Sequence, residues 1–226
     1  MITTIGKAFE YRDGMAIKTT RPPAENLSDT VTVIWQDKRT ISPEQRRKAF
    51  ALVGEIMAWD GLHGKSEQDR LHAQLKGMFL VRCMDDLTAE AIRTFSLHDC
   101  SMDTARLYIT FLIDMIIDQG IPTKESLISL ADDIEAYVYK CSISQKCCVC
   151  GKKAGVHHVD KVGMGRDRDA INHIGLLHLP LCWGVNSHHQ EVEHIGNEAF
   201  MEKYHLPAIP IDERIARIYK LRRQAK

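Results

Sequence analysis

The sequence predicts an α+β protein built from two domains. Short β-type segments followed by several capped helical stretches occupy residues 1–140, and a part rich in cysteine and histidine occupies residues 141–226. A chain of 226 residues is long enough to bury one large core or two modest ones. We therefore place a domain boundary near Cys141.

The first elements are predicted to be strands. The segment "KAFEYRDGMAIKTT" (7–20) has alternating residues on either side of Asp13 and Gly14, which is typical of a β-hairpin. The segment "DTVTVIW" (29–35) is rich in β-branched residues and follows a turn at two prolines, so we expect another strand there.

Helices are predicted for the rest of the first domain. The segment that starts at Ser42 has proline at the first helical position and Gln45 three residues after the cap, which is a capping-box pattern. Further helices are expected over residues 66–83, 101–119 and 124–140. The most apolar run, Leu107 to Ile117, is too short to cross a bilayer and contains an aspartate, so it predicts a buried helix.

The distribution of charge differs between the two predicted domains. Residues 1–140 carry 17 basic and 21 acidic side chains, whereas residues 141–226 carry 13 and 9, so the formal net charges are −4 and +4. Eight of the eleven histidines also follow residue 150. The second domain is therefore the one expected to meet a polyanion.

The cysteines indicate metal binding. Four of the seven lie between residues 141 and 150, and the start of the chain shows no signal-peptide pattern. We expect a reduced, cytoplasmic protein with metal-bound thiolates rather than a disulfide framework.

A structural zinc site can be assembled from the second domain. Cys147-x-x-Cys150 has the knuckle spacing that lets two thiolates reach one tetrahedral zinc ion. Cys182 and His188 supply the two remaining ligands of a closed site, and Cys148 is expected to point away from it.

The remaining histidines exceed what a zinc site needs. His157 and His158 begin an extended stretch, where adjacent side chains point to opposite faces, so one can bind a metal while the other faces water or substrate. His189 begins a predicted helix with Glu193 four residues on, on the same side, and a hard divalent cation accepts imidazole together with carboxylate. His194 is five residues after His189 and projects away from the side that His189 and Glu193 share.

The segments "HHVDKVGMGRDR", "LCWGVNSHH" and "HIGNEAFMEKYHLPAI" resemble the phage branch of the HNH endonucleases, also called ββα-metal or His-Me finger nucleases, over residues 146–210. The resemblance implies a small zinc-stabilised ββα-metal domain. It also implies that His158 is the general base, that His157 and His189 bind a catalytic Mg²⁺ or Mn²⁺, and that Cys147, Cys150, Cys182 and His188 bind structural Zn²⁺.

Two assignments within the resemblance stay open. The family's last metal ligand is usually a histidine four residues into the helix, where this chain has Glu193, followed directly by His194. The middle residue of the motif, which orients the base, can be Asn172, His173 or His178.

Basic residues of the second domain are candidates for contacts with DNA phosphates. Two lie in the glycine-rich turn after the histidine pair, and the others lie in a C-terminal tail with six basic residues among its last thirteen. We expect the tail to form a basic helix along the DNA backbone, with a simply solvated helix as the alternative. These candidates are Arg166, Arg168, Arg214, Arg217, Lys220, Arg222 and Arg223.

The first domain has a resemblance of its own. The segments "TISPEQRRKAF" and "CSMDTARLYITFLIDMIIDQGIP" resemble the Orf (NinB-like) recombination-mediator family of phage lambda, over residues 5–140. That resemblance implies a homodimer that binds single-stranded DNA and associates with single-strand-binding protein or a recombinase.

Two functions follow as hypotheses. The first is a metal-dependent DNA endonuclease of a phage recombination module, acting in the bacterial cytoplasm on single-stranded, branched or duplex DNA and without a membrane partner. The second is a non-catalytic recombination mediator whose zinc domain only grips DNA. The first accounts for His157, His158 and His189, which a DNA grip alone does not require.

Overall fold

The computed structural model of the chain describes residues 6–11, 14–19, 39–83, 95–160 and 172–221. The chain divides into two compact units, Met1–Gln36 and Asp37–Lys226. In the first unit, β1 (Gly6–Tyr11) pairs with β2 (Gly14–Thr19) in antiparallel register. The predicted hairpin is therefore confirmed, whereas the strand predicted at residues 29–35 lies outside the described residues.

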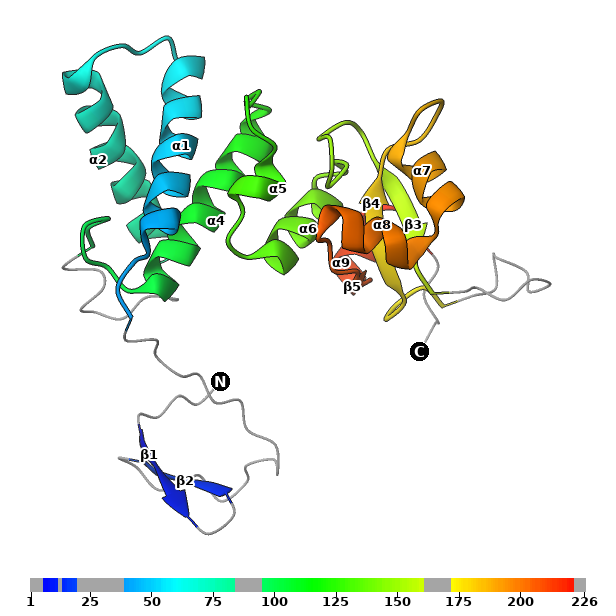
Figure 1. The fold of residues 1–226 in the computed structure, drawn as a ribbon, viewed down its shortest axis with the longest axis horizontal. Helices are drawn as coiled ribbons and strands as arrows, with labels where there is room; N and C mark the ends of the chain where they lie inside the picture. The colour runs from blue at the N-terminus through cyan, green and yellow to red at the C-terminus, as the bar shows by residue number, and fades with distance from the viewer. Residues whose placement is uncertain (1–5, 12–13, 20–38, 84–94, 161–171, 222–226) are drawn as a thin grey trace. The chain divides into compact units, whose positions relative to one another are not determined.

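The second unit begins with helices, which follow the predicted positions closely (Figure 1). α1 (Pro43–Trp59) starts with the predicted capping box, in which Ser42 and Gln45 exchange side-chain to backbone hydrogen bonds. α2 (Lys65–Arg82) and α4 (Met102–Gln119) match the predicted helices at 66–83 and 101–119 within about two residues. Ser42 and Ser101 cap the starts of α1 and α4 with side-chain hydrogen bonds, so these starts can be predicted from the sequence, whereas α2 begins after Gly64 without such a bond.

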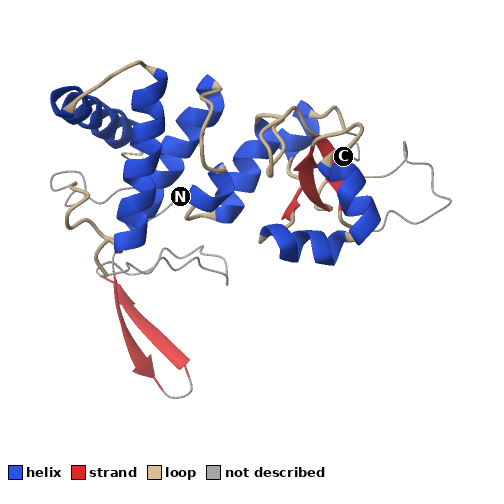
Figure 2. Ribbon diagram, turned by 45° about the horizontal axis from the view of Figure 1, so that its top comes forward, coloured by secondary structure: helices blue, strands red, loops and turns tan. Residues whose placement is uncertain are grey.

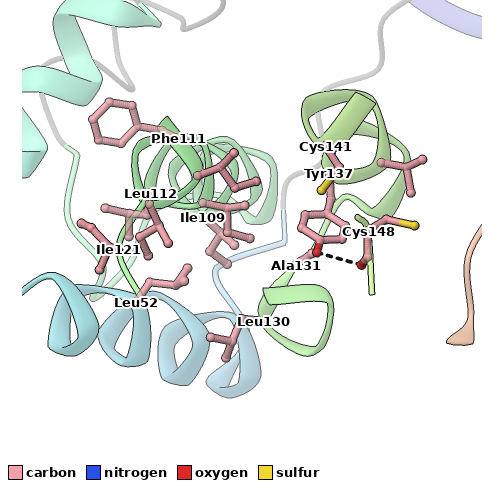
Figure 3. Close-up of a cluster of buried hydrophobic side chains, with 14 of the residues drawn as sticks. Leu52, Ile109, Phe111, Leu112, Ile121, Leu130, Ala131, Tyr137, Cys141 and Cys148 are labelled. Carbon is pink, nitrogen blue, oxygen red and sulfur yellow. Dashed lines mark hydrogen bonds between the residues drawn. The ribbon is translucent and has the colours of Figure 1, made fainter. Parts of the chain in front are cut away.

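The core of the helical part lies between α1 and α4 (Figure 3). Leu52 of α1 packs in one cluster with Ile109 and Leu112 of α4, and these side chains are fully buried. The apolar run from Leu107 to Ile117 is thus the buried helix that its composition predicts. Among the described residues, none of the helices combines the length and the hydropathy needed to span a membrane.

The helix predicted over residues 124–140 is wrong as a single helix. The structure has a short α5 (Leu127–Leu130) and a separate α6 (Ile134–Ile143), because Ala131 is extended and Asp133 caps the new helix by accepting from the amide of Ala136. Lys48 of α1 donates to the carbonyl of Ala131 at 3.0 Å, so a distant side chain satisfies the backbone at the break.

The C-terminal part of this unit is a small antiparallel sheet with three helices (Figure 2). The strand order is β3 (Gly155–His158), β4 (Leu177–Leu181) and β5 (Ile209–Pro210). The helices are α7 (His188–Ile195), α8 (Asn197–Tyr204) and α9 (Glu213–Ile218). The α+β class is confirmed, and the order β3, β4, α7 is the ββα arrangement.

Helix α6 connects the helical part with this sheet, since it contacts α4 on one side and β4, β5 and α9 on the other. The Tyr137 hydroxyl donates to the carbonyl of Cys148 at 2.9 Å inside the protein (Figure 3). The predicted boundary near Cys141 lies within this helix. The division into residues 1–140 and 141–226 therefore stays a prediction.

His178 forms a second link between α6 and the sheet. Its side chain is fully buried, with Nδ1 at 2.8 Å from the carbonyl of Ile209 and Nε2 at 3.0 Å from the hydroxyl of Ser142. Because the carbonyl can only accept, Nδ1 carries a proton. The Ser142 hydroxyl, next to Nε2, also donates to the carbonyl of Val138 at 2.9 Å. Burial lowers the pKa of His178, although the bond to Ile209 opposes the shift.

This burial predicts a pH-dependent stability. The unfolded chain binds a proton at His178 below pH ~6.5 and the folded chain binds it only at lower pH, so the contribution to stability is complete above pH ~6.5 and falls as the pH drops toward the lowered pKa. We expect the free energy of unfolding to lose up to about 1.4 kcal/mol per pH unit through this group. Urea unfolding of wild type and His178→Gln between pH 5 and 7.5 measures it, with a shallower slope expected for the variant. Equal slopes would show that His178 keeps its ordinary pKa.

Candidate active site

Four predicted zinc ligands come together at one end of the sheet. Cys147 and Cys150 lie in the turn between α6 and β3, Cys182 follows β4, and His188 is the first residue of α7. Their ligand atoms all lie within 4.8 Å of one another, and among the described residues this is the one such group of histidine, cysteine and acidic side chains.

The distances within this Cys3His cluster suit a tetrahedral zinc ion. The sulfurs of Cys150 and Cys182 are 3.7 Å apart, and Nδ1 of His188 is 3.3 Å from the sulfur of Cys182. Zn–S bonds of about 2.3 Å in a tetrahedron separate two sulfurs by roughly 3.8 Å. Burial raises the pKa of Cys147 to about 12, so zinc uptake displaces protons from the cluster.

Local backbone geometry builds the knuckle. Gly151 has φ of +71°, in the left-handed region, and its amide donates to the carbonyl of Cys147 at 2.8 Å. The amide of Cys147 in turn donates to the carbonyl of Lys152 at 2.7 Å. Cys148 is fully buried and does not belong to the cluster, so its thiol packs in the core.

The two histidines of β3 contact different partners, because adjacent side chains in a strand point to opposite faces. The ring of His157 lies 5.0 Å from the ring of His189 on α7, and Nδ1 of His189 is 3.7 Å from a carboxylate oxygen of Glu193. Burial lowers the pKa of His189, which favours the neutral imidazole that metal binding requires. Glu193, and not the exposed His194, is thus the residue beside His189.

Asn197, at the start of α8, orients the imidazole of His157. Its amide nitrogen donates to the carbonyl of Val159 at 2.9 Å, so its amide oxygen must be the atom that faces Nε2 of His157 at 2.8 Å. His157 therefore donates from Nε2, and the neutral ring keeps its lone pair on Nδ1. A metal-binding histidine commonly gives its other N–H to such an oxygen.

His158 has a different partner. Its Nε2 lies 2.9 Å from Nδ1 of His173, so one ring donates and the other accepts. Of the other two candidates for the middle residue, Asn172 accepts from the amide of Ile174, and His178 is bonded to Ser142 and Ile209 in the interior. His173 thus makes a hydrogen bond with the ring of His158, whereas His178 faces His158 across the two strands through the backbone.

The predicted DNA-binding residues are only partly described. Arg214, Arg217 and Lys220 are exposed on or just after α9, and this helix ends at Ile218, so the predicted basic helix is shorter than the tail. Four further candidates lie outside the described residues: Arg166, Arg168, Arg222 and Arg223.

Three residues of the site were not predicted: Asn197, Trp183 and Gly155. The indole of Trp183 stacks on the ring of His189, with centroids 3.4 Å apart and planes at 25°. A Cβ at Gly155 would lie 2.3 Å from Nε1 of that indole, so only glycine leaves room for it. Trp183 could have been found from the sequence, because it directly follows Cys182, a predicted zinc ligand. Asn197 had none, because its partner is forty residues away.

The arrangement defines a class of protein. Two antiparallel strands are followed by a helix, with a histidine pair on the first strand and another histidine in the first turn of the helix, which is the arrangement that the resemblance to HNH nucleases predicts. The model of one family, described as "Putative HNHc nuclease", matches residues 5–222. The chain belongs to this family. No curated protein and no solved structure matches it.

The Cys3His cluster predicts the metal content of the purified protein. We expect about one zinc per chain without supplementation, and Cys150→Ser should lose the zinc and unfold the sheet, because structural zinc supplies folding free energy directly. Elemental analysis and circular dichroism measure both effects. Cys148→Ala is the matched control, since it removes a neighbouring thiol and should keep the zinc. Folded wild-type protein without zinc would contradict the assignment.

Proposed function

We propose that this protein is a metal-dependent DNA endonuclease that hydrolyses phosphodiester bonds. The observation that carries the proposal is the division of the histidine pair on β3, with His157 next to His189 and His158 next to His173. Hydrolysis needs a positive charge at the phosphate and a base at the attacking water. His157 would help to bind the cation that carries the charge, and His158 would be the base.

The first side of the strand carries the residues proposed to hold a divalent cation, although their ligand atoms are not gathered as closely as those of the Cys3His cluster. His157, His189 and Glu193 would hold it, since Mg²⁺ and Mn²⁺ sites combine carboxylate with imidazole and the hydrogen bond from His157 to Asn197 leaves the Nδ1 lone pair for a ligand bond. A divalent cation there would supply positive charge to the phosphate and to the departing 3′ oxygen. Glu193, with a side chain 64% exposed, would complete the set from the solvent side.

The second side supplies the base. His158 would take a proton from the water that attacks phosphorus, a step that suits an imidazole near neutral pH. The 2.9 Å contact with His173 restrains the ring of His158. With Nε2 of His158 donating to Nδ1 of His173, the proton taken from water would go to Nδ1 of His158. His173 would then have the orienting role of the middle residue in the motif.

The substrate and partners belong to the same proposal. DNA is the expected substrate, and exposed Arg214 and Arg217 support phosphate binding. We also propose that the helical part helps to bring the enzyme to single-stranded or branched DNA as a dimer within a recombination system. The family match spans that part too, but the support for this role is the resemblance of residues 5–140 to the Orf family.

Replacing the base tests the mechanism. His158→Ala should keep the fold, the zinc and the affinity for DNA, while cleavage falls by about 10² to 10⁴. Assays on plasmid, single-stranded and branched DNA with Mg²⁺ or Mn²⁺ measure the effect. His63→Ala, an exposed histidine before α2, is the matched control and should cleave like wild type. Wild type that cuts no DNA with any divalent ion would leave the non-catalytic DNA-binding function.

Replacing the carboxylate tests the cation site separately. Glu193→Ala should weaken binding of the divalent ion, so that raising the Mg²⁺ or Mn²⁺ concentration restores part of the lost cleavage. His194→Ala should cleave like wild type at all metal concentrations. Calorimetric titration of Mn²⁺ gives a second readout without DNA. The reverse pattern, with a metal-rescued loss only in His194→Ala, would assign the ligand to His194.

A further inference from the structure

The loop between the two zinc ligands Cys182 and His188 is held rigidly at both ends. The amide of His188 donates to the sulfur of Cys182 at 3.3 Å, and the amide of His189 donates to its carbonyl at 3.1 Å. Ser187 caps α7 by accepting from the amide of Gln190. The loop is also longer than the short spacing usual for a knuckle, so it has room to present side chains.

This loop presents apolar side chains to solvent. Trp183 is 57% exposed and Val185 is 89% exposed, and the residues between and after them are also exposed. An indole in water is unfavourable, and folding does not hide it, although Gly155 and His189 hold the ring in place. One face of the indole lies on the imidazole of His189, so the exposed area belongs to the rest of the ring.

The position of the loop identifies the chemistry of a partner. Trp183 stacks on a proposed ligand of the catalytic cation, so the indole lies beside the place where the scissile phosphate would bind. Lys152 and Lys153 are exposed in the knuckle turn, and Lys153 is two residues before Gly155, against which the indole packs. An exposed indole, with exposed lysines nearby in the chain, is suited to a nucleic acid, whose bases stack and whose phosphates pair with ammonium groups.

We propose that Trp183 is a stacking platform for a nucleobase next to the scissile phosphate, with Val185 contacting the same strand. The inference rests on the proposed nuclease function and refines its substrate. Bases inside a duplex are stacked on both faces, so the indole can receive only a base that is unpaired, terminal or turned out of the helix. The preferred substrate is therefore DNA with an unpaired base at the cleavage site, such as single-stranded or bulged DNA.

Binding can be measured without cleavage by using the full chain with His158→Ala. In that background, Trp183→Ala should weaken binding of single-stranded and bulged DNA by about 5-fold to 150-fold and change binding of perfect duplex little. Trp183→Phe should keep most of the affinity, because it keeps an aromatic face. Trp59→Ala is the matched control, since Trp59 is 56% exposed on α1 and far along the chain.

A second variant and the fluorescence of Trp183 distinguish a loss of stacking from a loss of folding. Gly155→Ala keeps the indole but displaces it from the strand, so it should reproduce part of the loss with zinc content unchanged. In a chain with Trp35→Phe and Trp59→Phe, the fluorescence of Trp183 should be quenched by oligo-dT and not by duplex.

The outcomes separate this inference from the proposed function. Equal binding of bulged DNA by wild type and Trp183→Ala, equal losses for bulged DNA and duplex, or absence of quenching would overturn the stacking role. A loss of cleavage rate and Mn²⁺ affinity alone, with DNA affinity kept, would reduce Trp183 to a positioning residue for His189. If wild type cuts bulged DNA while Trp183→Ala keeps the same preference, the nuclease stands and this inference fails. If wild type cuts nothing but quenching persists, the nuclease function fails and base stacking on Trp183 stands.

Discussion

The Cys3His cluster is the constraint on which the rest of the C-terminal architecture depends. It joins the turn after α6, the end of β4 and the start of α7, three segments that share only a short sheet. The sheet is small, with a two-residue edge strand, so a zinc ion bound at the cluster would add to the packing of these segments against α6. Fixing Cys182 and His188 also fixes the next residue, His189, and so the position of the proposed cation site follows from the zinc ligands.

Buried hydrogen bonds link the helical part to this sheet. Tyr137 and Ser142, both on α6, reach the carbonyl of Cys148 and the ring of His178. Each contact satisfies a group that would be costly to bury alone. The family match over residues 5–222 agrees with this arrangement, since it treats the helices and the sheet as parts of one unit.

Features set by neighbouring residues could be predicted from the sequence, and features set by distant ones could not. The start of α1 follows from a short spacing and is confirmed. The four residues predicted to bind zinc form two short-spaced pairs that lie far apart in the chain, and the structure brings their ligand atoms together. The break between α5 and α6 has a local signal in the Asp133 cap, but the group that satisfies the carbonyl of Ala131 is Lys48, 83 residues away, so helical pattern alone missed the break. The choice among Asn172, His173 and His178 likewise depends on which ring returns to His158 across 15 residues of chain.

The alternation of side chains along β3 has a consequence for how this site can change. His157 and His158 are neighbours in the chain but serve opposite faces, and their register against β4, with His158 opposite His178, decides which face each one meets. A single-residue deletion or insertion in this strand would turn both imidazoles to the opposite faces, so that one would take the other's position and the second would leave the site. Substitutions can therefore adjust the site one residue at a time, whereas a change in the length of this strand would dismantle both halves at once.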